Sequence, residues 1–408
     1  MTVSFPLGRE GVLLQLIARS HTATFEQLPD LVAEHAALLG VRDVRIFAVD
    51  LQETVLREIT GQGLDAGAGG EQINVEGTLP GRAYQRVDLL AEQGSGGRQG
   101  RRWWAPVTDG VERLGVLGAQ VEAEDDEDAR GLLRDVASVV ALLLLSKRSF
   151  SDSFARLVRT RSMNVAAEMQ WNLMPPPAFA GNDLTIGGVI EPAYEVGGDA
   201  FDYAIAGQTA HLAVFDAMGH DIRAGITANL AVAACRNARR QGTSLADTSE
   251  AVEHVLAHHA GTSRYVTGVL ASLDLVSGQL TWVNRGHPLP LVIRGNRRVT
   301  ELRCPPAGPM GTNLNLPLTT CHQRLEPGDR LLLYTDGITE ARDARGEEFG
   351  RDRFVDYVLR HHSAHQTLHE TLRRLMHAVI DHHAGRLNDD ATVLLAEWRA
   401  GHQHGLTP

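Results

Sequence analysis

Phe215-Asp216-Ala217-Met218-Gly219-His220 is the stretch that decides the fold, because an apolar run ends there in an aspartate and a tight turn follows at once. Three more segments of the 408-residue chain also set aspartates at the tip of an apolar strand, beside glycine or a turn. Strand tips on a rigid scaffold can bring distant positions together, so we expect these carboxylates to meet. The three segments are Gly197-Gly198-Asp199-Ala200-Phe201-Asp202, Tyr334-Thr335-Asp336-Gly337 and Asn388-Asp389-Asp390-Ala391-Thr392.

One aspartate from each segment carries the predicted chemistry. If these carboxylates converge, each close pair repels by about 4 kcal/mol near a protein surface. Two divalent cations would cancel that charge, and ligands that are all oxygen select Mg²⁺ or Mn²⁺ over zinc or copper. A water molecule on such ions loses a proton near neutral pH and can attack a phosphate ester. The pattern predicts a metal-dependent phosphatase whose catalytic residues are Asp199, Asp216, Asp336 and Asp389.

From residue 183 onward the chain has the texture of a β-rich α/β domain. Several short apolar strands follow one another without a helical crossover, which argues against a doubly wound parallel sheet. We expect two or four layers of sheets and helices. Strands are predicted over 184–190, 210–215, 266–273, 279–283, 330–334 and 391–398, and helices over 222–240, 245–259 and 353–383.

Residues 1–124 alternate helix and strand signals and predict a separate α/β domain. The order of helix, strands, helix and a closing hairpin that ends in Gly115-Val116-Leu117-Gly118 resembles a GAF domain, a module that senses small molecules. The resemblance implies a small-molecule ligand. A chromophore attached through a thiol is excluded, because no cysteine precedes Cys235. His21 and His35 are expected on a helix surface or as satisfied core residues.

Residues 125–175 carry an extended helical pattern, in which apolar residues recur mostly at intervals of three or four. The pattern ends at Pro175, which cannot continue a helix. Two interpretations stay open: the helix packs on its own domains, or it forms a coiled coil that joins two copies in a homodimer. The expected organisation is a GAF-like sensor domain over 1–124, a helical linker over 125–175, a phosphatase domain over 176–400 and a tail over 401–408.

The acidic motifs, in this order, resemble the PPM (PP2C-type) phosphatases, and specifically their SpoIIE and RsbU branch. The similarity runs from residue 163 to residue 398 and includes Asn284-Arg285-Gly286-His287-Pro288 and Pro309-Met310-Gly311. It implies an α-β-β-α sandwich that binds two Mn²⁺ or Mg²⁺ ions. The implied metal ligands are Asp199, Asp216, the backbone carbonyl of Ala217, Asp336 and Asp389, with Asp390 as the competing candidate for the last position.

Further positions in these motifs are secondary candidates. Asp202 is either an outer-sphere support or a turn cap. His220 and His287 either supply a proton to the leaving serine oxygen or hold turns together by hydrogen bonds. Gly198 and Gly337 let backbone or ligand approach closely.

Two positions depart from the family pattern, and one cluster lies apart from it. Ala200 stands where an aromatic residue is common, and Asp221 stands where glycine is common. The separate cluster places histidines on successive helical turns, which indicates either a metal site or a solvated helix face. Its members are His361, His362, His365 and His369.

The resemblance implies a phosphoserine or phosphothreonine protein as the substrate, and most directly an anti-anti-sigma factor of the STAS type. The first domain would regulate the reaction by shifting the helical linker. Two alternatives remain: a phosphatase-like regulator that binds partners without turnover, and a metal-dependent hydrolase of small phosphoesters.

The bulk composition excludes several other classes of protein. A net charge of -11, from 39 basic and 50 acidic residues, argues against a nucleic-acid partner. Lys147, the only lysine, lies outside any glycine-rich loop, which excludes a Walker-type or kinase phosphate site. The longest apolar run, 136–145, is too short to span a bilayer, so we expect a soluble cytoplasmic protein without a membrane partner. Three cysteines without a C-x-x-C pair suggest neither a disulfide framework nor a thiolate metal site.

Overall fold

The computed structural model describes residues 8–92, 101–121, 126–195, 197–219, 221–259, 264–295, 297–362, 367–383, 387 and 389–399. The chain divides into two compact units, Met1–Ser162 and Met163–Pro408, each of which has its own buried core. Within the described ranges, no helix is both long enough and apolar enough to cross a membrane.

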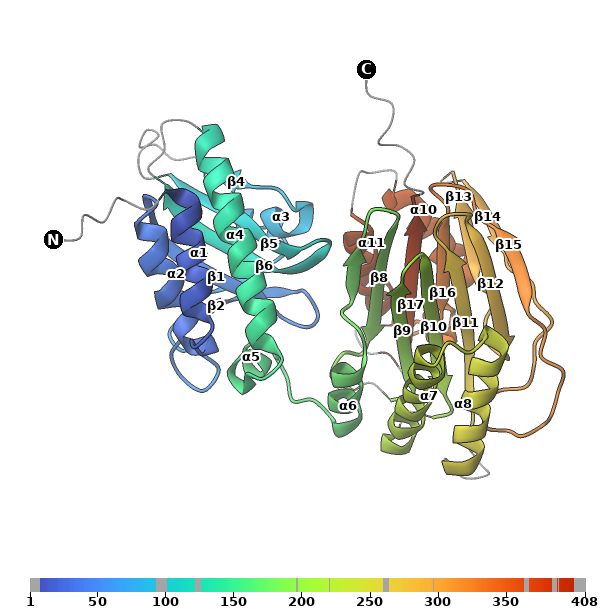
Figure 1. The fold of residues 1–408 in the computed structure, drawn as a ribbon. Helices are drawn as coiled ribbons and strands as arrows, with labels where there is room; N and C mark the ends of the chain where they lie inside the picture. The colour runs from blue at the N-terminus through green and yellow to red at the C-terminus, as the bar shows by residue number, and fades with distance from the viewer. Residues whose placement is uncertain are drawn as a thin grey trace, which may run out of the picture. The chain divides into compact units, whose positions relative to one another are not determined.

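The first unit is a six-stranded antiparallel sheet with helices on both faces (Figure 1). Neighbouring residues of a strand point to opposite faces, so Ile46 packs under α1, α2 and α4 while Phe47 packs under α3. In strand order the sheet consists of β3 (Gln72–Asn74), β2 (Val55–Ile59), β1 (Val41–Val49), β6 (Glu112–Val121), β5 (Arg102–Asp109) and β4 (Leu90–Ala91). The helices are α1 (Arg9–Ser20), η1 (Phe25–Gln27), α2 (Leu28–Ala37), α3 (Leu79–Arg86), α4 (Asp126–Arg148) and α5 (Asp152–Leu157).

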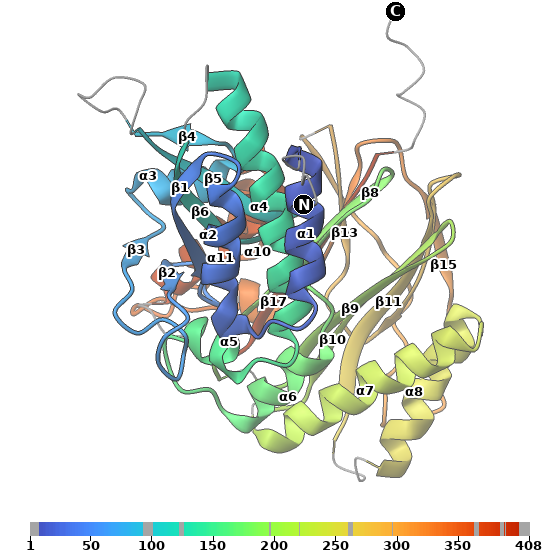
Figure 2. The same cartoon turned by 60° about the vertical axis from the view of Figure 1, so that its left-hand side comes forward.

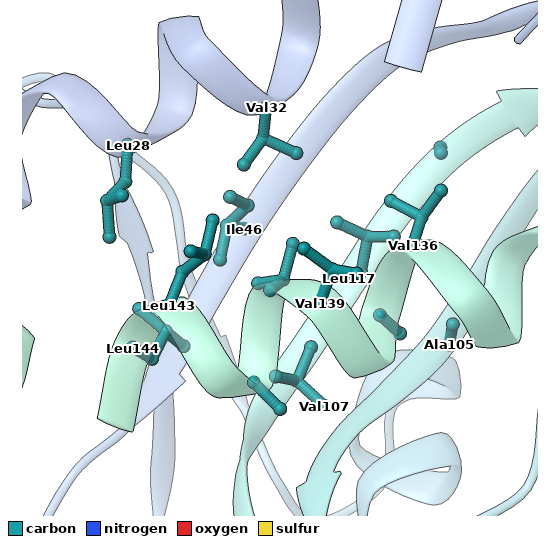
Figure 3. Close-up of a cluster of buried hydrophobic side chains, with 14 of the residues drawn as sticks. Leu28, Val32, Ile46, Ala105, Val107, Leu117, Val136, Val139, Leu143 and Leu144 are labelled. Carbon is teal, nitrogen blue, oxygen red and sulfur yellow. The ribbon is translucent and has the colours of Figure 1, made fainter. Parts of the chain in front are cut away.

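Helix α4 lies along the sheet of the first unit, as Figure 3 shows. Its Val136 and Val139 share a buried cluster with Val107 and Leu117 of the strands. The apolar stripe that suggested a coiled coil is therefore buried within its own unit. Of the two interpretations left open for this stretch, the structure shows the helix packed on its own unit. Leu142 and Phe150 stay exposed, and a homodimer through this stretch stays a prediction.

The predicted continuous linker over 125–175 is wrong. Helix α4 ends at Arg148, and Ser151 caps the separate α5, its side chain accepting a hydrogen bond from the Phe154 N–H at 3.1 Å. Asn164 does the same for α6 (Val165–Leu173), accepting from the Ala167 N–H at 2.7 Å. The predicted helical stretch is thus divided into the three helices α4, α5 and α6. The boundary between residues 162 and 163 assigns α6 to the second unit.

The second unit contains two antiparallel sheets that face each other. The first sheet is ordered β15 (Cys321–Arg324), β12 (Gln279–Arg285), β11 (Val266–Asp274), β10 (Thr209–Ala217) and β9 (Asp199–Ala206). The second sheet is ordered β14 (Arg298–Glu301), β13 (Leu291–Arg294), β16 (Arg330–Tyr334), β17 (Ala391–Trp398), β8 (Leu184–Glu191) and β7 (Ala178–Ala180).

Helices cover the outer face of each sheet, so the layers run α-β-β-α, as the sequence predicts (Figures 1 and 2). Helices α7 (Ile222–Arg240) and α8 (Leu245–His259) pack on the first sheet through an alanine-rich cluster, and their predicted bounds are confirmed. The single helix predicted over 353–383 is wrong, because Thr367 caps a separate α11 (Leu368–His382) after α10 (Arg351–His362). The short α9 (Asp336–Thr339) follows β16.

A disulfide joins Cys304 to Cys321 in the second unit, with 5.9 Å between their Cα atoms. This pairing corrects the expectation drawn from cysteine spacing. Cys304 is buried in the core between the sheets, and Cys321 opens β15 beside β12, so the fold brings together two residues that are 17 positions apart. Cys235 is buried and free.

Candidate active site

Asp199 and Asp216 lie directly opposite each other on neighbouring strands. Asp199 opens β9, Asp216 lies near the end of β10, and the antiparallel register pairs the two residues. Such partners hold their Cβ atoms about 4.5–5.5 Å apart. On its other side Asp216 is paired with Thr267 of β11. The first sheet therefore delivers two acidic side chains to one edge of the sandwich.

Thr335 connects the second sheet to this pair. Its hydroxyl donates to Oδ2 of Asp199 at 2.6 Å and accepts the Thr392 N–H at 2.9 Å. The Thr335 N–H in turn donates to the Thr392 carbonyl at 3.0 Å. Asp336, the next residue, begins α9. The ends of β16 and β17 thus lie against the start of β9.

The two candidates for the last acidic position have different surroundings. Oδ2 of Asp390 accepts the backbone N–H groups of Gly197, Gly198 and Asp199 at 2.8, 2.6 and 3.1 Å. Asp389 is exposed, and its Oδ1 accepts the Asp390 N–H at 2.9 Å. Asp390 therefore holds the loop that carries Asp199, and Asp389 presents its carboxylate to solvent. These contacts favour Asp389 as the ligand.

Gly198 and Gly337 permit close backbone approaches around the acidic residues. A Cβ at position 198 would lie 2.2 Å from the carbonyl oxygen of Ala217, and one at position 337 would lie 1.9 Å from the carbonyl oxygen of Asp390. Neither position has room for a side chain. The carbonyl of Ala217, predicted as a ligand, therefore lies against the Asp199 loop.

The strand-end carboxylates form an acidic cluster, which consists of Asp199, Asp216, Asp336, Asp389 and Asp390. Burial and mutual repulsion raise the pKa values of Asp199, Asp216, Asp336 and Asp390. The pKa of Asp199 is raised well above its usual range by burial, and further by Asp216 and Asp390. Burial raises the pKa of Asp216 to about 7, with contributions from Asp336, Asp389 and Asp390. The pKa of Asp336 is raised by burial and by Asp389. Each carboxylate is thus close enough to another to feel its charge.

This donor set fits hard divalent cations. It offers only oxygen atoms, and its surplus negative charge is what a Mg²⁺ or Mn²⁺ ion relieves. Over the ranges described here, no three His, Cys, Asp or Glu side chains already stand close enough to hold a metal ion. Carboxylates that repel one another are not expected to form a tight cage by themselves. The metal site at these residues stays a prediction.

His287 is buried beside this cluster, and both of its ring nitrogens have partners. Nε2 lies 3.0 Å from the Tyr334 carbonyl, which can only accept, so Nε2 carries the proton. Nδ1 lies 2.8 Å from the hydroxyl of Thr267 and accepts from it. Burial lowers the pKa of His287 to about 4, so the ring is neutral at pH 7. These contacts favour a structural role over proton transfer; His220 lies outside the described residues.

Asp202 lies away from the acidic cluster, in an ion-paired group with α7. Arg236 donates from Nε to Oδ1 at 2.8 Å, and Arg239 donates from a terminal nitrogen to Oδ2 at 2.7 Å. Neither predicted role, outer-sphere support or turn cap, matches this position. Asp202 follows Asp199 by three residues on the same strand, and side chains at that spacing point to opposite faces of the sheet.

Two more predicted positions have defined contacts. Asp221 caps α7 by accepting the Ala224 N–H at 2.9 Å and pairs with Arg264, so its carboxylate points outward and not at the acidic cluster. His369 is buried on α11, which excludes a solvated face for that residue. The side chains of the other three histidines of its cluster lie outside the described residues.

Gln170 contacts the Asp199 loop, and the sequence did not lead us to expect a role for it. It is fully buried on α6, and its Nε2 donates to the Asp199 carbonyl at 2.6 Å and to the Gly197 carbonyl at 3.3 Å. It lies within residues 163 to 398, over which the family resemblance runs. A polar residue among the apolar residues of a helix was the available signal.

Comparison with known proteins agrees with this geometry. The family described as Stage II sporulation protein E (SpoIIE) matches residues 206–399, which include Asp216, Asp336 and Asp389 but begin after Asp199. The carboxyl-terminal half carries a SpoIIE-type phosphatase domain. The amino-terminal α/β unit lies outside that match.

Individual relatives are distant. Phosphoserine phosphatase RsbU of Bacillus subtilis is 21% identical over 234 residues, which cover 57% of this chain and 69% of RsbU. Protein IcfG of Synechocystis is 26% identical over 148 residues, which cover 36% of this chain and only 23% of IcfG. The SiaA-PP2C domain of Pseudomonas aeruginosa aligns with 57% of this chain and 94% of its own length, at 23% identity and a TM-score of 0.49. In sequence, the carboxyl-terminal part of this chain is thus similar to a phosphoserine phosphatase, RsbU.

Proposed function

We propose that this chain is a metal-dependent protein serine/threonine phosphatase. The observation that carries the proposal is the cross-strand pair Asp199 and Asp216, whose charges interact with those of the strand-end residues Asp336, Asp389 and Asp390. Among the described residues, no basic side chain pairs with Asp199 or Asp216. Buried carboxylates with raised pKa values are unfavourable for stability without such a partner, which points to a functional role.

The residues proposed to hold two Mn²⁺ or Mg²⁺ ions are Asp199, Asp216, the carbonyl of Ala217, Asp336 and Asp389. Bound ions of this kind supply an activated water and neutralise charge on the phosphoryl oxygens. No nucleophile from the protein is then needed.

The surrounding residues of the chain position this site. Thr335 fixes the rotamer of Asp199 by its 2.6 Å hydrogen bond, and Asp390 holds the preceding backbone through three N–H groups. His287 engages the hydroxyl of Thr267, whose contact with Asp216 is long at 3.5 Å. Asp216 therefore keeps its carboxylate lone pairs for a cation.

The proposed substrate is a phosphoserine or phosphothreonine in a protein, most directly an anti-anti-sigma factor of the STAS type. Its support is the relationship to RsbU, which is named a phosphoserine phosphatase. We further propose that the first unit is a GAF-like sensor that binds a small molecule and regulates the SpoIIE domain. The order of its elements, with helices on both faces of an antiparallel sheet, supports this assignment.

The test is Mn²⁺-dependent hydrolysis by the full chain. An aryl phosphate, a phosphorylated STAS protein and free nucleotides are compared, each with Mn²⁺ and with a chelator. The proposal expects metal-dependent release of phosphate from the aryl phosphate and from the phosphoprotein, but not from nucleotides. Turnover of nucleotides in preference to the phosphoprotein would favour the small-phosphoester alternative. Binding of the phosphoprotein without any turnover would favour the non-catalytic regulator.

Regulation is tested separately, with residues 163–408 against the full chain. Residues 163–408 must first show a cooperative unfolding transition, so that the fragment is known to be folded. The proposal expects the two to differ in turnover number on the phosphoprotein, and equal turnover with and without candidate small molecules would contradict it.

A further inference from the structure

A cavity of about 220 Å³, partly open to solvent, lies between the helices α7 and α8 and the first sheet of the second unit. The sheet contributes His211 and Ala213 of β10 and Leu270 and Ser272 of β11. These residues face each other in the register, His211 opposite Ser272 and Ala213 opposite Leu270. The β10 residues of the cavity lie three to five positions from Asp216, and its lining includes none of the acidic strand-end residues.

The wall formed by α7 carries a surplus positive charge. Arg236 and Arg239 both pair with Asp202, whose side chain is only 1% exposed. Within the described part of the chain, Asp202 is the only carboxylate that pairs with either arginine, so two guanidinium groups share one negative charge. Arg239 is 12% exposed and lines the cavity. Burial lowers the pKa of His211, and the charge of Arg239 adds to this, so the neutral ring is favoured.

The rest of the lining is apolar or carries hydroxyl groups. Ala213, Leu270 and Cys235 form an apolar floor, and burial raises the pKa of the Cys235 thiol to about 12, so the thiol stays neutral. Thr248 and Ser272 add hydroxyl groups at the edge. A compact ligand that fits this lining has an apolar body and one negative charge.

The volume limits the size of that ligand. Sites for drug-sized molecules and cofactors measure about 300–1,000 Å³, so a nucleotide is too large for this cavity. A planar carboxylate matches a guanidinium group better than a spherical anion does, because two parallel N–H groups can donate to its two oxygens.

We propose that this cavity binds a small organic monocarboxylate, with the carboxylate on Arg239 and the apolar body against Ala213, Leu270 and Cys235. The ligand would bridge α7, α8 and the sheet. This site is separate from the acidic cluster, and its assignment does not depend on the phosphatase proposal.

The test measures binding of benzoate to the full chain by ligand-observed NMR and by isothermal titration calorimetry. The buffer contains a chelator, so that no metal ion at the acidic cluster can bind the carboxylate. Benzamide serves as the neutral isostere, and hexanoate and acetate vary the apolar body. The proposal expects saturable binding of benzoate or hexanoate, with acetate and benzamide weaker by on the order of tenfold or more.

Three variants locate the binding. Arg239→Gln removes the charge, and Ser272→Leu fills the cavity while leaving the Asp202 ion pairs in place. Each is expected to weaken binding by on the order of tenfold or more. Arg240→Gln is the matched control, since it makes the same change one position away at an exposed site, and it is expected to bind as the wild type does.

Ser272→Leu keeps the test decisive if Arg239→Gln does not fold. The proposal is overturned if none of the three carboxylates binds saturably, if benzamide binds as well as benzoate, or if the folded Ser272→Leu protein binds undiminished.

Discussion

Asp199 and Asp202 lie three residues apart on the same strand, and both are buried, with 2% and 0% of their surface exposed. Asp202 is neutralised by two arginines of α7. Asp199 has other carboxylates as neighbours, and Thr335 is its side-chain hydrogen-bond donor at 2.6 Å. Two buried aspartates of one strand therefore have opposite electrostatic surroundings. A carboxylate balanced by cations of the fold is structural, whereas one that lacks balance is available to an external cation.

The largest effect is expected from Asp336→Asn, which changes a carboxylate of the acidic cluster around Asp199. Loss of one proposed ligand should lower Mn²⁺-dependent turnover of an aryl phosphate by about a thousandfold, since a metal contributes several kcal/mol to such a transition state. Steady-state kinetics at saturating Mn²⁺ measures the effect. Asp356→Asn is the control: it makes the same chemical change at an exposed position of α10 and should leave turnover unchanged. Equal activity of the two variants would remove Asp336 from the site.

The balanced residue should instead control stability. Asp202→Asn leaves two largely buried arginines without their carboxylate, which should lower the free energy of unfolding by about 3 kcal/mol. Asp199→Asn, in metal-free protein at pH 8, should raise that free energy or leave it unchanged. The folded-state pKa of Asp199 is raised, so its stabilising contribution is present at low pH and lost once the group ionises. Urea denaturation of both variants checks the pair, and a large loss for Asp199→Asn contradicts the comparison.

Thr335 connects the two sheets at the unbalanced residue, so its removal should loosen Asp199. Thr335→Val keeps the shape but loses the hydrogen bonds to Asp199 and to the Thr392 N–H. Loss of a residue that orients a ligand typically costs 10- to 100-fold in metal affinity or activity, and about that loss of Mn²⁺ affinity is expected. Titration of activity against Mn²⁺ measures it, and Thr335→Ser should restore most of the affinity.

His287 provides the smallest effect, in the dependence of stability on pH. Its pKa is about 4 in the folded protein and about 6.5 in the unfolded chain. The unfolded state therefore binds more protons below pH 6.5, and stability falls as pH falls from 6.5 toward 4. Between pH 7 and 5.5 the loss should be about 1 kcal/mol. The side chain of His287→Gln cannot titrate, so this variant should lack this part of the dependence of unfolding free energy on pH. Chemical denaturation at each pH measures it, with each protein's unfolding free energy taken relative to its own value at pH 7.

Regular elements with strong patterns could be predicted from the sequence with little error. Helices α7 and α8 begin and end where apolar spacing and polar flanks place them, and strand β16 occupies its predicted residues. Short edge strands such as β14 and β15 were not predicted, because four-residue strands with exposed side chains carry no apolar alternation. The break between α10 and α11 was missed for a related reason, since a capping threonine within a polar stretch is a weak signal.

The sequence by itself determined which carboxylates stand beside tight turns, and so identified Asp199, Asp216, Asp336 and Asp389 as candidates for one site. Only the tertiary structure decided that Asp202 faces arginines, that Asp390 binds backbone, and that Cys304 meets Cys321. The physical reason is that residue type and spacing specify what a side chain can do. The charges and donors that surround it come from distant segments, as with Asp199 and Asp390, which are 191 positions apart. Only the packed fold brings such segments into contact.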